Sequence, residues 1–303
     1  MTLQPLNQGC YYFDLPVNIG YINHEETGIL IDAGIDAGTA KKVASILEKE
    51  EMPLTHLLVT HAHADHFGGA AWLQTHYNIM TLAPPFEGAV MQNPRLEPVY
   101  LFQGTEPPRV MRTKFLEAEP VRVDGKLREG RMDIGGINVQ VLVLGGHSHA
   151  QVGIEVHGHL YAADSYFGRE YLNKHKIPFM VDVKAGLHSL RKILKTTLKG
   201  SLPGHGSYET SFDDTVRYNI DWHKRLLGEL EEIVAKNEKM TFEEATAAFC
   251  CKEGVELNDM PSWSLYRTAA GAYLQALVDD GQLQWMIEDN FLKVHHQESQ
   301  SVR

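Results

Sequence analysis

The chain has 303 residues, of which 43% are apolar and 22% charged, as is ordinary for a soluble globular protein. This length fits a single large α/β domain, or one sizeable domain with a smaller one. Asp and Glu number 39 against 28 Lys and Arg, so the formal net charge is −11 with neutral histidine. Such a surface repels phosphate backbones, which disfavours general nucleic-acid binding.

The cysteines and the first residues predict a cytoplasmic protein. There are three cysteines, Cys10 and the adjacent Cys250 and Cys251, which do not suit a disulfide framework. The first ten residues have neither the basic nor the apolar region of a secretion signal. No stretch approaches the roughly 20 apolar residues that cross a bilayer, so no membrane partner is expected.

The first quarter of the chain predicts strands, then a helix and a further strand. β-Branched and aromatic residues are enriched over residues 10–34, which predicts an antiparallel meander that ends near Asp32. Apolar residues at helical spacing predict a helix over 38–51, and Leu57-Leu58-Val59 predicts the next strand. After the residues that follow this strand, we expect a short helix and then a buried strand over 79–83.

The strand at 57–59 leads into Thr60-His61-Ala62-His63-Ala64-Asp65-His66-Phe67-Gly68-Gly69. Four potential metal ligands lie within six residues, and imidazole with carboxylate suits zinc and comparable first-row metals. Alternate residues at a strand end point the same way, so we expect His61 and His63 to share one metal. Asp65 and His66 lie where the chain turns into a helix, so they can face a second metal.

Residues 84–118 differ in composition from their surroundings. Six prolines interrupt a stretch that also holds the aromatic residues Phe86, Tyr100, Phe102 and Phe115. The stretch is too rich in proline for regular core structure and too aromatic for a disordered linker. We interpret it as a lid-like excursion packed over the site, or as a partner contact. The alternative is a surface loop with no role in the chemistry.

The middle of the chain predicts further strands that end in potential ligands. Strands are expected at 121–123, 137–144, 152–156 and 159–163, and a helix near 184–198. His147 follows the second of these strands in a Gly-Gly-His sequence, and Asp164 ends the predicted hairpin. His205 lies in the Gly-rich turn Pro203-Gly204-His205-Gly206. Potential ligands at successive strand ends are what a metal site at a sheet edge needs.

From about Ser211 the chain becomes helical. We expect a long amphipathic helix after a capping box at 211–214, a second helix capped by Thr241 with Glu244, and a third over 263–279. A polar tail follows Val294. Residues 241–303 hold four Lys and Arg residues against ten Asp and Glu residues, whereas a nucleic-acid reader needs the opposite balance. We therefore expect this region to cover the active site or to form a homodimer contact.

Seven residues resemble, in type and order, the metal ligands of the metallo-β-lactamase fold superfamily: His61, His63, Asp65, His66, His147, Asp164 and His205. The resemblance covers roughly residues 10–206 and rests on the HxHxDH motif, the Gly-Gly-His, the strand-end Asp, the Pro-Gly-His-Gly and the upstream Asp32-Ala33-Gly34. It implies an α/β fold, a four-layer αββα sandwich, over residues 1–210. The helices over 211–303 resemble the small winged-helix-like domain of some family members.

The resemblance also implies how the ligands are shared between two metals at one edge of the sheets. The first metal would be held by His61, His63 and His147. The second would be held by Asp65, His66 and His205, with Asp164 bridging the two. Two zinc ions are the expected cofactors, and iron or manganese are alternatives because His and Asp sites accept both.

Other polar residues near these motifs are assigned lesser roles. Asp32 would orient metal ligands, unless it is a plain turn residue, and we assign catalytic roles to Asp32 and Asp65. His149, two residues after His147, is a candidate substrate or proton-transfer group. We interpret Tyr161 and Tyr166, which flank Asp164, as buried tyrosines, with a hydrogen bond to substrate as the alternative.

The residues favour one chemistry within the family. Two dications lower the pKa of a shared water and so provide a nucleophile. True zinc β-lactamases of this fold usually lack a bridging Asp, so Asp164 disfavours antibiotic hydrolysis. The segment after Asp164 lacks the Cys-Gly-Arg type of sequence of glyoxalase II, which puts hydroxyacylglutathione in doubt as the substrate. The leading prediction is a dinuclear hydrolase of the glyoxalase II-like or lactonase-like branch, acting on a small ester, thioester or lactone.

Two other functions stay open at this point. One is a mononuclear iron enzyme resembling the persulfide dioxygenases, which reuse the positions of His61, His147 and Asp164. The other is a nucleic-acid-binding or processing protein that uses the C-terminal helices, although the net charge opposes it.

Overall fold

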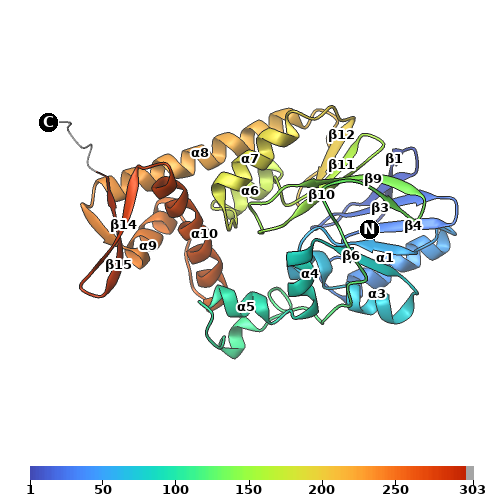
Figure 1. Cartoon of the computed structure of the whole chain (residues 1–303), viewed down its shortest axis with the longest axis horizontal. Coiled ribbons are helices and arrows are strands. Elements are labelled where there is room, and N and C mark those ends of the chain that lie inside the picture. Colours follow the sequence, from blue (N-terminus) through green and yellow to red (C-terminus); the bar gives the residue numbers. More distant parts are fainter. Residues whose placement is uncertain (298–303) are drawn as a thin grey trace.

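The computed structural model describes residues 1–297 and contains two facing β-sheets enclosed by helices (Figure 1). The first sheet has seven strands in chain order: β1 (Leu3–Asn7), β2 (Cys10–Phe13), β3 (Ile19–His24), β4 (Thr27–Ile31), β5 (His56–Leu58), β6 (Met80–Ala83) and β7 (Gly125–Lys126). Strands β1 to β4 are antiparallel, which confirms the predicted meander, and β4 to β7 are parallel.

The second sheet has five strands in the order β12-β11-β10-β9-β8: β8 (Gly130–Ile134), β9 (Ile137–Val143), β10 (Val152–Val156), β11 (His159–Ala163) and β12 (Gly200–Pro203). Its neighbouring strands are antiparallel except β11 and β12, which are parallel. The hairpin predicted over 152–163 is confirmed as β10 and β11. The strand predicted at 121–123 is wrong, because that stretch has no strand and the next one begins at Gly125.

Alternation of apolar side chains explains how the layers stack. On β4, Ile29 and Ile31 face the second sheet, whereas Leu30 between them belongs to the cluster beneath the outer helices. Val139 and Val141 of β9 meet the first sheet from the other side. Side chains of a strand alternate between its two faces, so a strand covered on both faces is a continuous apolar run.

Helices cover both outer faces and complete the αββα sandwich predicted from the sequence. Helices α1 (Ala37–Lys49) and α3 (Ala70–His76) pack on the first sheet, with the short α2 (Ala64–Phe67) before α3. The second sheet is covered by α6 (Arg169–His175), α7 (Val183–Ile193) and the first half of α8 (Asp213–Ala235). The helices predicted at 38–51 and near 184–198 correspond to α1 and α7.

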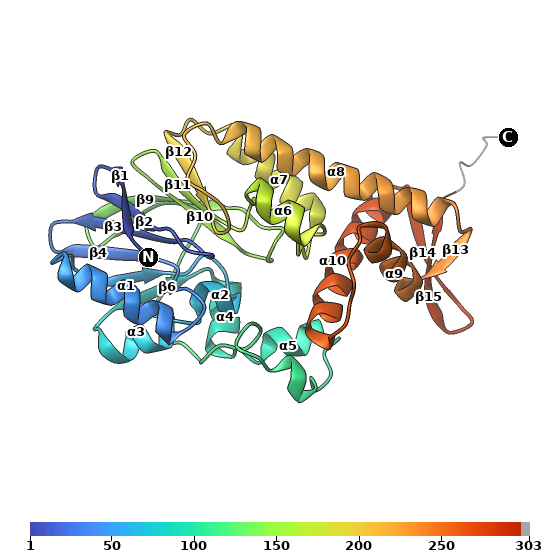
Figure 2. The same cartoon turned by 180° about the vertical axis from the view of Figure 1, so that it is seen from behind.

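The proline-rich segment 84–118 contains more regular structure than its composition suggests. It forms α4 (Pro85–Gln92), α5 (Leu96–Leu101) and a 3-10 turn at Arg109–Met111. Pro85 is the first residue of α4, and Pro98 lies in the first turn of α5. Prolines are tolerated there because the first amide groups of a helix have no intrahelical acceptor. The segment reaches across to α10, as seen from behind in Figure 2.

The C-terminal region is helical as predicted, and it also contains a small sheet that the sequence analysis missed. After α8 come β13 (Lys239–Thr241), α9 (Phe242–Lys252), α10 (Met260–Asp279), β14 (Leu283–Glu288) and β15 (Phe291–His296). The three strands pair in the order β13-β15-β14. Helices with a β-hairpin are consistent with a winged-helix-like unit. The last part of the predicted polar tail, residues 298–303, lies outside the described residues.

Helix α8 joins the two parts of the chain. Its first half packs under the second sheet through Val216 and Ile220, and its contacts continue to α9 and α10. The predicted capping box at 211–214 is wrong, because α8 begins at Asp213 without a side-chain cap. The domain boundary between residues 210 and 211 stays a prediction, since one hydrophobic cluster continues along this helix.

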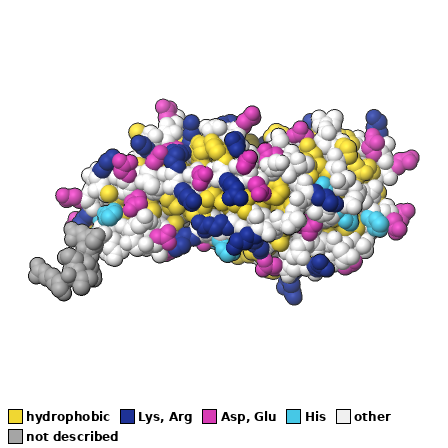
Figure 3. Space-filling model, turned by 90° about the horizontal axis from the view of Figure 1, so that it is seen from above, with side chains coloured by type: hydrophobic (Ala, Val, Ile, Leu, Met, Phe, Trp, Pro, Cys, Tyr) yellow, Lys and Arg dark blue, Asp and Glu magenta, His cyan; other side chains and the backbone are white. Residues whose placement is uncertain are grey.

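The face crossed by α8 carries charges of both signs. Figure 3 shows Lys and Arg side chains gathered over its middle, with Asp and Glu side chains beside them. Several cations of α7 and α8 are paired: Lys184 with Asp280, Lys192 with Glu129, and Arg225 with Glu229 and Glu253.

The cysteines Cys10, Cys250 and Cys251 are all free. Within residues 1–297, no helix is both long and apolar enough to cross a membrane.

The predicted cap of α9 is confirmed and provides a test of the C-terminal region. The Thr241 hydroxyl accepts from the Glu244 amide (3.1 Å), and the Glu244 carboxylate accepts from the Thr241 amide (2.8 Å). Thr241→Ala should lower the free energy of unfolding by about 1 kcal/mol, as measured by denaturant titration. Thr241→Ser keeps the hydroxyl and is the control. Equal stability of the Ala and Ser variants would contradict a role for the cap.

Candidate metal centre

The seven predicted ligands meet at one edge of the two sheets, beyond the carboxyl ends of the strands that deliver them. His61 and His63 lie in the loop after β5, and Asp65 and His66 lie on α2. The other three follow strands of the second sheet: His147 after β9, Asp164 directly after β11, and His205 after β12. Segments of the two sheets that are far apart in sequence therefore supply one site.

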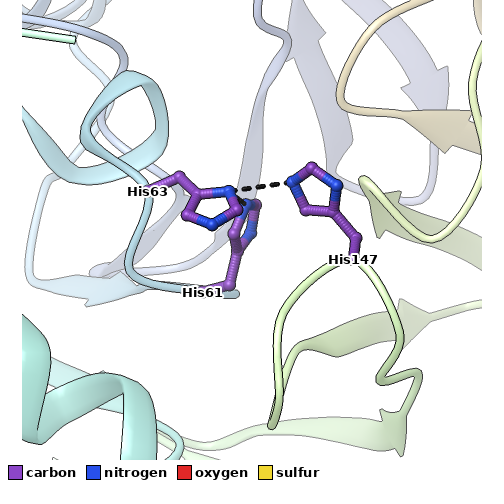
Figure 4. Close-up of side chains that lie close together, drawn as sticks. All are labelled: His61, His63 and His147. Carbon is purple, nitrogen blue, oxygen red and sulfur yellow. Dashed lines mark hydrogen bonds between the residues drawn. The ribbon is translucent and has the colours of Figure 1, made fainter. Parts of the chain in front are cut away.

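His61, His63 and His147 form the first group, with their nitrogen atoms converging (Figure 4). His63 Nδ1 lies 3.1 Å from His61 Nε2 and 2.8 Å from His147 Nε2. With bond lengths of about 2.0–2.1 Å, the ligand nitrogens of a tetrahedral zinc ion are roughly 3.4 Å apart. The three nitrogens are thus close to the spacing that one metal imposes.

Asp65, His66 and His205 form the second group. His205 Nε2 lies 3.4 Å from Asp65 Oδ2. Asp164 lies between the two groups: its Oδ1 is 3.2 Å from His66 Nε2, and its Oδ2 is 3.3 Å from His147 Nε2. Asp164 also forms a group of potential ligands with His61 and His66.

Two buried atoms at the middle of the site have no hydrogen-bond partner. They are His66 Nε2 and Asp164 Oδ1, which are close but not aligned for a hydrogen bond. An unsatisfied buried polar atom costs about 1–3 kcal/mol, so such pairs are rare without a ligand. The donor set, five imidazoles and two carboxylates, is the set that zinc, iron and manganese accept. The residues present therefore fit two first-row metal ions.

Three of the histidines that would bind metal are held from their other ring nitrogen. His66 Nδ1 is 2.8 Å from Asp32 Oδ2, His147 Nδ1 is 2.9 Å from the Phe179 carbonyl, and His205 Nδ1 is 2.8 Å from the Pro16 carbonyl. A carbonyl or carboxylate accepts only from N–H, so these contacts place the proton on Nδ1 and leave Nε2 available to a metal.

Asp32 holds its place behind His66 at some backbone cost. Its φ of 66° lies in the left-handed region, and its carboxylate accepts from the Thr60 amide (2.8 Å) and the Thr60 hydroxyl (2.8 Å). Such a conformation costs about 1–3 kcal/mol in a residue other than glycine. Asp32 does not line the cavity of about 310 Å³ beside the ligands, whereas Asp65 does. The location of Asp32 behind His66 supports the predicted orienting role and leaves Asp32 outside the space where a substrate would bind.

The turn that carries His205 needs a glycine beside Asp164. A Cβ at Gly204 would lie 2.1 Å from Asp164 Oδ1 and 2.9 Å from His66 Cε1. No side chain fits there without displacing both ligands. The Pro-Gly-His-Gly sequence thus has a steric reason for its first glycine.

The metal-free site has a divided electrostatic character. Burial lowers the pKa of His63 and His147 to about 4, so both are neutral at pH 7. Burial alone would also lower the pKa of His205, but Asp164 and Asp65 raise it to about 9. The same carboxylates, with Asp32, raise the pKa of His66 well above its ordinary value. The pKa values of the histidines in the second group are therefore raised by ion pairing with the carboxylates that surround them.

A buried carboxylate that sequence reasoning missed joins the two loops that hold the first group. Glu87 of α4 accepts from the Ala62 amide (3.0 Å) between His61 and His63. It also accepts from the Ser148 hydroxyl (2.7 Å) and the Ala150 amide (2.9 Å), just after His147. The only sequence signal is a lone acidic residue in the apolar first turn of a helix, and that pattern is normally a solvent-exposed position.

Five of the seven ligands form the floor of a cavity of about 310 Å³. They are His63, Asp65, His147, Asp164 and His205. Its walls come from three segments far apart in sequence: Glu97, Phe115 and Leu116; Tyr171, His175, Ile177, Pro178 and Phe179; and Leu265, Tyr266 and Ala269 of α10. The C-terminal helices thus contribute to the cover of the site, one of the two roles expected for them.

Four further side chains differ in whether they line the cavity. Tyr161 and Tyr166 are buried, as expected, and neither lines the cavity. His149 is exposed and packs on Phe86, with ring centroids 5.2 Å apart, so the candidate proton-transfer role has no support. Tyr171 lines the cavity and stacks on His205 at 4.4 Å, yet no motif singled it out.

Comparison with known proteins agrees with this fold and site. The family model of the metallo-beta-lactamase superfamily matches residues 12–218, and the chain belongs to that superfamily. A beta-lactamase domain protein from Burkholderia ambifaria has the same fold, with a TM-score of 0.76 at 20% identity over 97% of this chain and 94% of its own. A metallo-beta-lactamase family protein from Thermus thermophilus gives 0.74 at 15% identity, over 96% and 100%.

Relatives with closer sequences are hydroxyacylglutathione hydrolases. The protein from Rhodopseudomonas palustris strain BisB18 is 32% identical over 154 residues, 50% of this chain and 48% of its own length. The protein from strain BisB5 is 29% identical over 153 residues, with the same coverage. The chain therefore matches about half the length of these relatives.

The position of Glu87 predicts an effect on metal affinity. Glu87→Gln keeps the size of the side chain but cannot accept from all three donors, so both ligand loops lose a common anchor. We expect the affinity for zinc to fall roughly 10–100-fold, as for other residues that hold metal ligands in place. Competition with a chromophoric chelator measures this. Glu50→Gln, on the exposed end of α1, is the control, and equal affinity in the two variants would contradict the anchor.

The raised pKa values at the second group predict proton release on metal binding. His205, whose pKa is about 9, carries both ring protons at neutral pH in the metal-free protein, and a ligand imidazole must lose the proton on its metal-binding nitrogen. Zinc titration by calorimetry in buffers of different ionisation enthalpy should show release that declines as pH rises through about 9. His205→Gln should reduce the release by about one proton. Unchanged release in that variant would contradict the assignment of His205.

Proposed function

We propose that the protein is a dinuclear metal-dependent hydrolase that acts on a small ester, thioester or lactone. The observation that carries the proposal is the position of Asp164 between two complete groups of ligands, on the floor of a walled cavity. His61, His63 and His147 would hold one ion, and Asp65, His66 and His205 the other, with Asp164 shared. Zinc is the default metal, and iron or manganese are alternatives.

The ions would supply an activated water and polarise the oxygen of the bond to be cleaved. The chain's own residues do the rest. His147 and His205 are oriented through backbone carbonyls, and Asp32 orients His66, so the ligand geometry is set in advance. The apolar walls limit the water that reaches the cavity and strengthen electrostatic interactions within it.

Two observations favour the hydrolysis of an ester or thioester over the other reactions of the superfamily. Relatives named hydroxyacylglutathione hydrolase match half of the chain, and their name describes the hydrolysis of a thioester. A shared Asp164 also disfavours β-lactam hydrolysis by the resemblance described above. The size of the cavity suits a small molecule.

Nucleic-acid binding has less support. Lys and Arg gather on the face of α7 and α8 (Figure 3), but Lys184, Lys192 and Arg225 are paired with carboxylates there. A phosphate backbone would have to displace these partners, which weakens the electrostatic term that dominates such binding. None of these basic side chains lines the cavity.

Elemental analysis with a panel of esters, thioesters and lactones tests the proposal. We expect about two metals per chain and activity that chelation abolishes. Asp164→Asn should lower kcat/KM by more than about 100-fold, beyond the loss typical for residues that merely support a ligand. His149→Ala is the control and should stay within about twofold, because it does not line the cavity. Inertness of the metal-replete protein on the whole panel, or one iron per chain with oxygen consumption, would contradict the proposal.

A further inference from the structure

Four polar side chains line the cavity in addition to the metal ligands: Glu97, Tyr171, His175 and Tyr266. Tyr266 is already engaged, because its hydroxyl donates to the His175 carbonyl (3.0 Å). Tyr171 is the one whose ring packs on a ligand, with its centroid 4.4 Å from that of His205. Tyr171 thus adjoins the group of ligands that would hold the second metal.

The hydroxyl of Tyr171 is available to a substrate. Its Oη makes no hydrogen bond with any of residues 1–297, and it is not one of the fully buried atoms that lack a partner, so it borders open space. A phenol is protonated at neutral pH and can donate one hydrogen bond. A polar atom at the edge of a cavity is satisfied by water or by a ligand. This hydroxyl is therefore a ready donor beside His205.

The direction of the hydroxyl is fixed before a substrate binds. The rings of Phe167 and His175 also pack on Tyr171, with centroids 4.7 and 4.2 Å away. Phe167 is itself held by Asn219 of α8, which accepts from the Phe167 amide (2.9 Å) and donates to the Phe167 carbonyl (2.8 Å). A tyrosine hydroxyl lies on the axis of its ring, so a fixed ring fixes the donor. Such donors act most strongly on charge that develops during a reaction, because they need no reorganisation.

The hydrolysis of an ester or thioester develops charge at a defined atom. The oxygen of water forms a bond to the carbonyl carbon and loses a proton, while the π electron pair of the carbonyl moves onto the carbonyl oxygen. That pair then returns, the bond from carbon to the leaving alcohol or thiol breaks, and the leaving group takes up a proton. Between these steps the former carbonyl oxygen is an oxyanion, which a hydrogen-bond donor stabilises more than it stabilises the substrate carbonyl.

We propose that Tyr171 is a catalytic residue whose hydroxyl donates a hydrogen bond to the substrate carbonyl oxygen and stabilises the oxyanion formed there. This rests on the proposed function for the reaction, and it adds to the metal ions a donor supplied by α6. The phenol keeps its proton throughout, so no proton is transferred to the substrate. Because the hydrogen bond strengthens as charge develops, its loss should act mainly on kcat.

Kinetics of metal-loaded Tyr171→Phe on the esters or thioesters that the panel identifies test the proposal. Phenylalanine keeps the ring that packs on His205 and removes only the hydroxyl. We expect kcat to fall about 10–100-fold and KM to change less than about threefold, with zinc content and Tm unchanged.

Tyr166→Phe is the matched control for the loss of one hydroxyl. Tyr166 is buried two residues after Asp164 but does not line the cavity, so kcat should stay within about twofold of the wild-type value. A kcat of Tyr171→Phe within the same twofold range, or a loss of zinc that accounts for its lower kcat, would overturn the proposal.

Binding of butylphosphonate provides a readout that does not depend on turnover. Its anionic tetrahedral phosphorus group has the shape of the tetrahedral intermediate. Calorimetry on the zinc-loaded protein should show about tenfold weaker binding to Tyr171→Phe and unchanged binding to Tyr166→Phe, because one hydrogen bond to a charged oxygen is lost. Equal binding to Tyr171→Phe and to the wild-type protein would overturn the proposal, even if the protein hydrolyses esters. Inertness on the substrate panel, with the tenfold loss of binding intact, would instead overturn the proposed hydrolysis and leave the hydrogen bond from Tyr171 standing.

Discussion

The structure depends on one buried carboxylate placed among imidazoles. Asp164 lies within 3.5 Å of nitrogen atoms on His66, His147 and His205, which arrive on three different segments. Burial alone would raise the pKa of Asp164, yet these histidines hold it well below its ordinary value. Without a metal, such a concentration of charge and unsatisfied atoms is costly. A bound cation would balance these carboxylates and give a partner to the two unsatisfied atoms, His66 Nε2 and Asp164 Oδ1.

Groups that do not line the cavity hold the ligand segments in place. Asp32 and Glu87 are both buried carboxylates, and each accepts hydrogen bonds from more than one element. Asp32 joins the end of β4 to the start of the ligand loop and to His66, and it adopts a strained backbone conformation to do so. Glu87 joins the loop after β5 to the loop after β9. Together they fix, across both sheets, the distance between ligands such as His63 and His147, which lie 84 residues apart in the chain.

The sequence predicts the ligand site better than the cavity for a physical reason. Metal ligands belong to few residue types at constrained spacings, so the spacing alone suggests that His61 and His63 share a metal, and the resemblance to the superfamily adds His147 to them. Glu87, Glu97 and Tyr171 belong to no such pattern, because their roles depend on which loops fold next to them. The strands β13, β14 and β15 were also missed, because β13 has only three residues and the exposed apolar residues Ile287, Phe291 and Leu292 leave β14 and β15 without a clear alternation.

Different parts of the chain thus provide the metal ligands and the walls of the cavity. The ligands lie within the segment that matches the superfamily, and solved structures of the same fold extend over nearly the whole chain at 20% identity or less. The walls of the cavity come instead from α5 and the loop after it, from α6 and the residues after it, and from α10. Asp32 and Glu87, which do not line the cavity, hold the ligand segments from behind. One arrangement of ligands can therefore serve different substrates.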